Sequence, residues 1–209
     1  ELLAPTFDSR EIPESGTPGP WLLRRDDALG IWRTKLGLKV VDERITISHD
    51  TADPLLGIVA RQTERPGETK YIDRGVLTAI GHMQETDIAR LPGSHRLRGL
   101  TGYRMSGGDT SMGEMISTTR RGLLVTRLSN IRVLDGASLL STGLTRDGLW
   151  LIENGRITKA VKNFRFTESP LFALNSVEQI GESVPLFRPT RGAGGELRPA
   201  IVPTIKVRD

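Results

Sequence analysis

The side chains that most often bind metals or attack substrates are scarce in this chain, whose 209 residues include three His and no Cys. Without a thiol there is no disulfide, no cysteine nucleophile and no cysteine-based zinc or iron–sulfur site. His49, His82 and His95 are separated by 33 and 13 residues, so no two have the short spacing of a ligand pair. His82 lies three residues before Glu85, which we interpret as a polar surface pair rather than a metal site.

Other patterns that could support catalysis lack their usual context. Gly93-Ser94-His95 is not part of a G-x-S-x-G motif between a strand and a helix. The run from Gly192 through Gly194 and Gly195 is rich in glycine, but no G-K-[ST] follows it and a predicted strand comes next. We therefore expect a flexible or substrate-facing loop there. Adjacent carboxylates such as Asp42-Glu43 point to different faces of a regular element, so we expect them to be solvated.

Composition and charge are those of an ordinary soluble protein. The chain has 29 Lys and Arg against 25 Asp and Glu, and the excess lies in residues 106–209, with 14 basic and 10 acidic side chains. Aromatic residues are only 5%, and none lies between Arg188 and Arg208, so we do not expect nucleic-acid binding. The longest charge-free stretches have ten residues, too few for a membrane-spanning helix. There is no signal peptide, but the sequence starts at Glu1 and an N-terminal part can be missing.

The first half of the sequence predicts short elements separated by turns. Apolar residues at helical spacing predict a helix over 21–36, and β-branched residues predict a strand over 38–48. A second strand-rich unit covers 69–80, with a bend at Asp73-Arg74-Gly75, and a short helix is expected over 84–91. The pattern Ser111-x-x-Glu114 is a capping box, which predicts a helix from Ser111 to about Arg120.

The region from Leu123 to Phe166 predicts an antiparallel meander. Three dipeptides that favour the positive φ angles of tight turns divide it, namely Asp135-Gly136, Asp147-Gly148 and Asn154-Gly155. After it, Ser169-Pro170 predicts the start of a helix that ends at Ile180, and Ala200–Val207 predicts a last strand. The fold class is therefore α+β, with a predominantly antiparallel sheet and a few short helices.

Three stretches of the meander and its flanks are distinctive, namely Ser141-Thr142-Gly143, the run from Gly148 to Lys162, and Val177-Glu178-Gln179-Ile180-Gly181. They resemble the C-terminal domain of the TldD/TldE (PmbA) metallopeptidase family. Earlier pieces, such as Leu36–Val41 and Asp73–Leu77, follow in family order. We thus assign residues 29–209 to this domain and residues 1–28 to an N-terminal strap and the start of a helix, with the family's N-terminal domain absent from the chain.

The resemblance implies an assembly of two related subunits around an internal chamber. The TldD-type subunit carries an H-E-x-x-x-H zinc motif and a downstream Cys and cuts unfolded peptides, whereas the TldE-type subunit lacks these ligands. Here the motif would fall within residues 5–25, which contain no His, and the Cys would fall within 191–196. The resemblance therefore implies a catalytically silent TldE-like subunit that holds no metal or other cofactor, while zinc is expected only in a TldD-like partner.

Within that assembly we expect His49, Asp50, Gly192, Gly194 and Gly195 to contact an unfolded peptide substrate, and we expect a cytoplasmic location without membrane contact. A homo-oligomer is a further possibility. Two alternatives stay open at this point. The protein can be an active peptidase whose ligands lie outside this chain, or a stand-alone module that binds a peptide, or nucleic acid through the face from Arg188 to Arg208.

Overall fold

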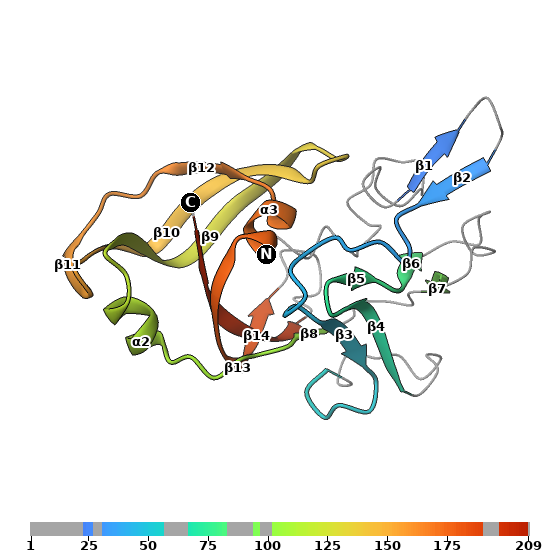
Figure 1. Cartoon of the computed structure of the whole chain (residues 1–209), viewed down its shortest axis with the longest axis horizontal. Coiled ribbons are helices and arrows are strands. Elements are labelled where there is room, and N and C mark those ends of the chain that lie inside the picture. The colour runs from blue at the N-terminus through green and yellow to red at the C-terminus, as the bar shows by residue number, and fades with distance from the viewer. Residues whose placement is uncertain are drawn as a thin grey trace.

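The structure is a computed structural model that describes residues 23–26, 31–56, 67–82, 94–96, 102–189 and 197–208. Most of these residues form strands, arranged in two larger sheets that lie side by side and two short strand pairs (Figure 1). The predicted α+β class with a dominant antiparallel sheet is confirmed. No helix in the described part of the chain is long and apolar enough to span a membrane.

The larger sheet has six strands in the order β13-β14-β8-β3-β4-β5. All neighbours in it are antiparallel except β14 and β8, which are parallel. It brings the end of the chain beside its first half. The strands are β3 (Ile47–Asp50), β4 (Glu68–Asp73), β5 (Val76–Leu77), β8 (Tyr103–Met105), β13 (Val177–Pro189) and β14 (Leu197–Val207).

The second sheet has four strands and contains the predicted meander. Its central strand, β10, pairs with β9 on one side and with β11 and β12 on the other. The strands are β9 (Arg121–Asp135), β10 (Leu140–Glu153), β11 (Arg156–Ala160) and β12 (Arg165–Glu168). Asn154 and Gly155, with φ of 50° and 78°, connect β10 to β11 as a two-residue hairpin.

The two other turn dipeptides have different outcomes. Gly136 to Leu139 connect β9 to β10, and the Asp135 carboxylate accepts hydrogen bonds from the backbone N–H groups of Ala137 and Ser138 at 3.4 and 2.9 Å. Asp147-Gly148, by contrast, does not end a strand, so this turn prediction was wrong. Both residues have positive φ, but they form a bulge inside β10, because a bulge uses the same left-handed conformation as a tight turn.

The two helices in the described part of the chain begin where the sequence predicted and end earlier than predicted. Helix α2 (Met112–Ser117) is capped by Ser111, whose Oγ accepts from the Glu114 N–H at 3.1 Å. Helix α3 (Pro170–Asn175) begins after Ser169 but ends five residues before Ile180. The chain enters β13 at Val177 instead, because Val177 and Ile180 are buried in the core from an extended strand.

The predicted helix over 21–36 was wrong. The structure has an antiparallel pair there, β1 (Leu23–Asp26) with β2 (Ile31–Thr34). The sequence between these strands contains Asp27 and Gly30, which favour turns. Our prediction gave more weight to the helical spacing of the apolar residues. The strand over 38–48 is also shorter than predicted, since only Ile47–Asp50 pairs as β3. The helix predicted over 84–91 lies outside the described residues.

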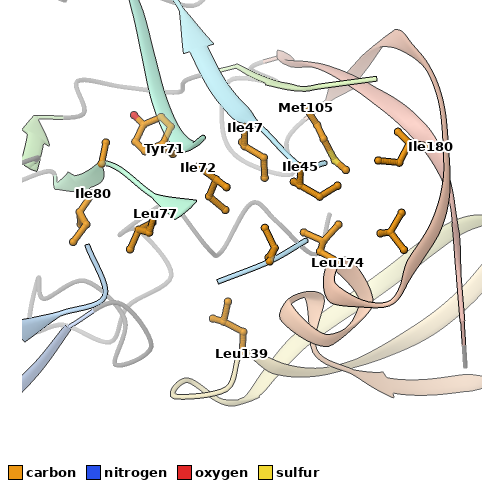
Figure 2. Close-up of a cluster of buried hydrophobic side chains, with 13 residues drawn as sticks. Ile45, Ile47, Tyr71, Ile72, Leu77, Ile80, Met105, Leu139, Leu174 and Ile180 are labelled. Carbon is orange, nitrogen blue, oxygen red and sulfur yellow. The ribbon is translucent and has the colours of Figure 1, made fainter. Parts of the chain in front are cut away.

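The main core lies at the six-stranded sheet and extends to the junction with the second sheet (Figure 2). Leu139, from the turn between β9 and β10, and Leu174, from α3, pack into it beside the sheet's own side chains. Ser169 ties the start of α3 to the turn between β9 and β10, because its buried Oγ donates to the Ser138 carbonyl oxygen at 2.6 Å. Within the six-stranded sheet, Arg44 links the segment before β3 to β13 by donating to the Glu178 carbonyl oxygen at 3.1 Å. The packing of Leu139 and Leu174 into the core holds the two sheets against one another.

Candidate functional site

Residues from three distant segments meet at one end of the six-stranded sheet. β3 runs antiparallel to β8, and β8 runs parallel to β14, so the end of β3 lies beside the starts of β8 and β14. This arrangement places His49 and Asp50 next to Gly102 and Arg104, with Asp53 in the turn that follows β3. We refer to these five residues as the sheet-end cluster.

His49 is buried, with 4% of its surface exposed. Its Nδ1 lies 2.6 Å from the Gly102 carbonyl oxygen, and because a carbonyl only accepts, Nδ1 is the donor. A Cβ on Gly102 would come within 2.8 Å of the Pro199 carbonyl oxygen and 2.9 Å of Leu56 Cδ2, so only glycine fits there. His49 thus secures a close approach of three chain segments, at the point where β14 begins.

Asp50 and the turn after it are organised by short-range hydrogen bonds. The Asp50 Oδ1 accepts from the Ala52 N–H at 2.9 Å, while Thr51 Oγ1 accepts from the Gly67 N–H at 3.0 Å. The second bond ties the turn to the segment that leads into β4. Asp50 is half-buried, so part of its carboxylate surface faces solvent at this end of the sheet.

Asp53 and Arg104 form an ion pair between the turn and β8. Burial acts to raise the pKa of Asp53, whose side chain is 11% exposed, but hydrogen bonds from Arg104 and from the N–H groups of Leu55 and Leu56 outweigh it. The pKa of Asp53 is therefore lowered, and its charge is neutralised locally by Arg104. This pair stabilises the turn and leaves neither group available as a strong acid, base or nucleophile.

The predicted glycines, Gly192, Gly194 and Gly195, lie outside the described residues. The strand residues that flank them are described, and Pro189 of β13 pairs with Leu197 of β14. Since Leu197 lies three residues before Ala200, which pairs with Tyr103, this pair is at the same end of the sheet as His49 and Asp50. The described strand residues on either side of the predicted glycines, Pro189 and Leu197, therefore lie at the same end of the sheet as His49 and Asp50.

The residues in the described part of the chain do not fit a zinc ion. No group of three or more His, Cys, Asp or Glu side chains among them could hold a metal. The described backbone does bring His82 and His95 onto adjacent parallel strands, β6 (Ile80–His82) and β7 (Ser94–Arg96). They are one residue out of register there, since His82 pairs with Arg96 and His95 with Gly81. The sequence did not indicate this neighbourhood.

Sequence reasoning also missed Gly102, Asp53 and Arg104 as members of the cluster. Asp53 and Pro54 lie in the turn after β3, and the Asp53 carboxylate stabilises this turn by accepting from the N–H groups of Leu55 and Leu56. The contact between Asp53 and Arg104 joins residues 51 positions apart, and no local pattern signals such a pairing.

Comparison with known families assigns the fold. The sequence profile of the PmbA/TldA metallopeptidase C-terminal domain matches residues 26–209. The chain therefore belongs to the TldD/TldE (PmbA) family. A comparison with curated proteins gave no match.

Solved structures of the TldD/TldE family and its gyrase-modulator relatives share this fold. TldE from Thermococcus kodakarensis superposes with a TM-score of 0.68 at 18% identity, over 99% of this chain and 46% of that one. A putative modulator of DNA gyrase from Thermotoga maritima MSB8 gives 0.64 at 18% identity, over 99% and 44%. One from Bacteroides thetaiotaomicron VPI-5482 gives 0.56 at 20% identity, over 82% and 38%. The chain thus spans less than half the length of each of these proteins.

Proposed function

We propose that this chain is part of a TldE-like, catalytically silent subunit of a TldD/TldE-type metallopeptidase that acts on unfolded peptides. One observation carries the proposal: the match to the metallopeptidase C-terminal domain covers residues 26–209, yet the sequence contains no Cys and no H-E-x-x-x-H motif. The similarity to TldE from Thermococcus kodakarensis supports the same assignment. In this proposal zinc belongs to a TldD-like partner in the cytoplasm, and this subunit contributes to assembly and to peptide binding.

The sheet-end cluster suits such a role. Its charged groups, Asp53 and Arg104, are paired with one another, and His49 donates from Nδ1 to a backbone carbonyl. The cluster therefore shapes a surface rather than supplying a reactive group. An extended peptide can be held on such a surface by main-chain hydrogen bonds that do not depend on its sequence. We assign this contact to His49, Asp50 and the glycines Gly192, Gly194 and Gly195.

Co-purification of the protein with its partner tests the proposal. The protein is purified from its native host, its partners are identified by mass spectrometry, and zinc is measured in the separated subunits. We expect a TldD-like protein to co-purify, zinc to remain with that partner, and a denatured peptide to be cut only when the partner is present. The partner with its zinc removed by a chelator serves as the control for metal dependence.

Two results would contradict the proposal. If the separated protein itself holds one zinc ion per chain and cuts denatured peptide, the silent role is wrong and the protein is an active peptidase. If it has no partner and instead binds oligonucleotides with an affinity that falls steeply with added salt, a nucleic-acid module replaces the proposal.

A further inference from the structure

A cavity opens on one face of the four-stranded sheet, remote from the sheet-end cluster in sequence. Its volume is about 350 Å³, and residues of β9, β10 and β12 line it, namely Asn130, Ile131, Arg132, Leu144 and Arg165. The size is at the lower end of the range for ligand pockets, so it suits one side chain or a chain end better than a long polymer. The two arginines are its only charged lining residues.

A bulge in β9 places both arginines on the same face of the sheet. Ser129 pairs with Leu144 and Arg132 with Thr142, so β9 uses three residue steps where β10 uses two. Asn130, with φ of 52°, provides the left-handed conformation that such a bulge needs. Without the extra residue, alternation along the strand would put Arg132 on the opposite face from Ser129. With it, Arg132 shares the face of Leu144, whose other neighbour is Arg165.

Neither arginine is neutralised within the described part of the chain. Arg104 pairs with Asp53 and Arg127 pairs with Asp147, although several other arginines on this sheet also lack a partner among the described residues. Arg132 and Arg165 make no ion pair or hydrogen bond with any described residue. From Arg120 to Glu168 the sequence has nine Lys and Arg against four Asp and Glu, whereas the whole chain has a net charge of +4. The positive charge of this protein is therefore concentrated on the sheet that carries the cavity.

The chemistry of the lining favours a carboxylate. A guanidinium offers a planar fork of N–H donors that matches a carboxylate, and two forks at one cavity can satisfy both of its oxygens. Ile131 and Leu144 add apolar walls, which suit the methylene groups of an acidic side chain. No aromatic residue lines the cavity, so the stacking that single-stranded nucleic acids use is missing.

The position of the cavity favours an extended peptide as the source of that carboxylate. β9 pairs only with β10 among the described strands, so its other edge can add a peptide strand through main-chain hydrogen bonds. Exposed apolar residues lie along β9 on either side of the cavity, where Leu134 is 58% and Val125 is 40% exposed. A matching peptide would carry an acidic group with apolar residues near it.

We propose that Arg132 and Arg165 form a carboxylate-binding pocket that selects peptides with an acidic side chain or a free C-terminal carboxylate. The inference deepens the proposed function, since it rests on the subunit binding unfolded peptide. It adds a specificity site on the four-stranded sheet, distinct from the sheet-end cluster. The bulge at Asn130 is the positioning device that brings the two guanidinium groups together.

Binding of fluorescent peptides to the 209-residue chain, followed by anisotropy, tests the pocket. The peptides share one apolar sequence and differ in three ways: a central Glu with an amidated C-terminus, a central Gln with a free C-terminus, and a central Gln with an amidated C-terminus. We expect the last to bind about tenfold or more weakly than whichever carboxylate peptide the pocket takes, since charge-assisted hydrogen bonds are lost. The first two peptides separate a side-chain carboxylate from a chain end.

Variants then locate the effect. Arg132→Gln and Arg165→Gln should each remove most of the preference for the carboxylate peptide, while Arg156→Gln, which removes one charge from β11 of the same sheet, should change it less than twofold. Deletion of Asn130 should act like Arg132→Gln although both arginines remain. If that deletion does not fold, the two substitutions decide.

Four results would overturn the pocket. Equal binding of all three peptides would do so while leaving peptide binding itself, and thus the proposed function, intact. An equal loss in Arg156→Gln would show that only the general positive charge matters. A single-stranded oligonucleotide that binds through Arg132 and Arg165 and displaces the peptide would assign the site to nucleic acid. If no peptide binds at all, the peptide-binding part of the proposed function fails together with the pocket.

Discussion

The substitution His49→Phe keeps a planar ring in β3 but removes the nitrogen that donates to the Gly102 carbonyl oxygen at 2.6 Å. Both His49 and Gly102 are buried, so water cannot replace the lost donor. A buried acceptor left without its donor costs about 1–3 kcal/mol. We therefore expect a loss of about 2 kcal/mol in the free energy of unfolding, or about 4–8 °C in Tm for a chain of this size. His49→Asn should lose less than half as much, because its amide can donate from near the Nδ1 position.

Urea unfolding followed by tryptophan fluorescence measures these losses, and peptide anisotropy on the same variants separates two roles of His49. If His49 acts by holding Gly102, His49→Asn restores stability and peptide binding together. If it contacts peptide directly, His49→Asn restores stability alone. Asp50→Asn is the control, since its Oδ1 can still accept from Ala52, and it should change stability by less than about 0.5 kcal/mol. A His49→Phe protein as stable as the wild type would refute the reasoning.

Two further predictions concern stability. Hydrogen bonds from the Arg44 side chain and N–H lower the pKa of Asp42 from 3.8 to about 2, so Asp42 contributes stability that is present above pH 4 and lost as the pH falls towards 2. The shift corresponds to at most about 2.4 kcal/mol, and because Arg44 is 47% exposed we expect about 1 kcal/mol. Asp42→Asn should therefore be less stable than wild type by about 1 kcal/mol at pH 6, and most of this difference should be lost as the pH falls through 2. A difference that does not change with pH would contradict this. Gly75→Ala should lower the free energy of unfolding by about 3 kcal/mol, because the φ of Gly75 is +79° and a Cβ there would lie 2.5 Å from the Val41 carbonyl oxygen. The control is Gly37→Ala, which should lower it by about 1 kcal/mol, because Gly37 has a φ of +80° but no atom within 4 Å of the added Cβ. Equal losses of stability in the two variants on urea unfolding would show that the close contact between the added Cβ at position 75 and the Val41 carbonyl oxygen does not contribute.

The conformation of some short segments was readable from the sequence, whereas strand register was not. Asp147-Gly148 and Asn154-Gly155 both have positive φ, as their residue types predict, but the first pair forms a bulge and the second a hairpin. The difference depends on how far β10 continues its pairing with β9, which is a property of two strands rather than of a dipeptide. Likewise Ser169-Pro170 correctly predicted the start of α3, while its end depended on the burial of Val177 in the core.

The candidate site shows the same limit more strongly. His49 and Gly102 are 53 residues apart, and Asp53 and Arg104 are 51 apart, so neither contact has a sequence signature. His49 was expected to contact peptide only within the assembly that the family resemblance implies. Its partner could be identified only once β3 and β8 were known to be neighbours.

Charged side chains are paired at the end of one sheet and, among the described residues, unpaired at the cavity of the other. At the end of the six-stranded sheet, Asp53 and Arg104 neutralise each other and His49 donates to the backbone, so that surface is shaped but not reactive. On the four-stranded sheet, Arg132 and Arg165 have no partner among the described residues and face one cavity. In the proposed function, a subunit that leaves the metal to its partner would still affect catalysis by deciding which peptide is presented. If the proposed function holds, these two arginines, rather than any residue of a metal site, are where we expect the protein to select its peptide.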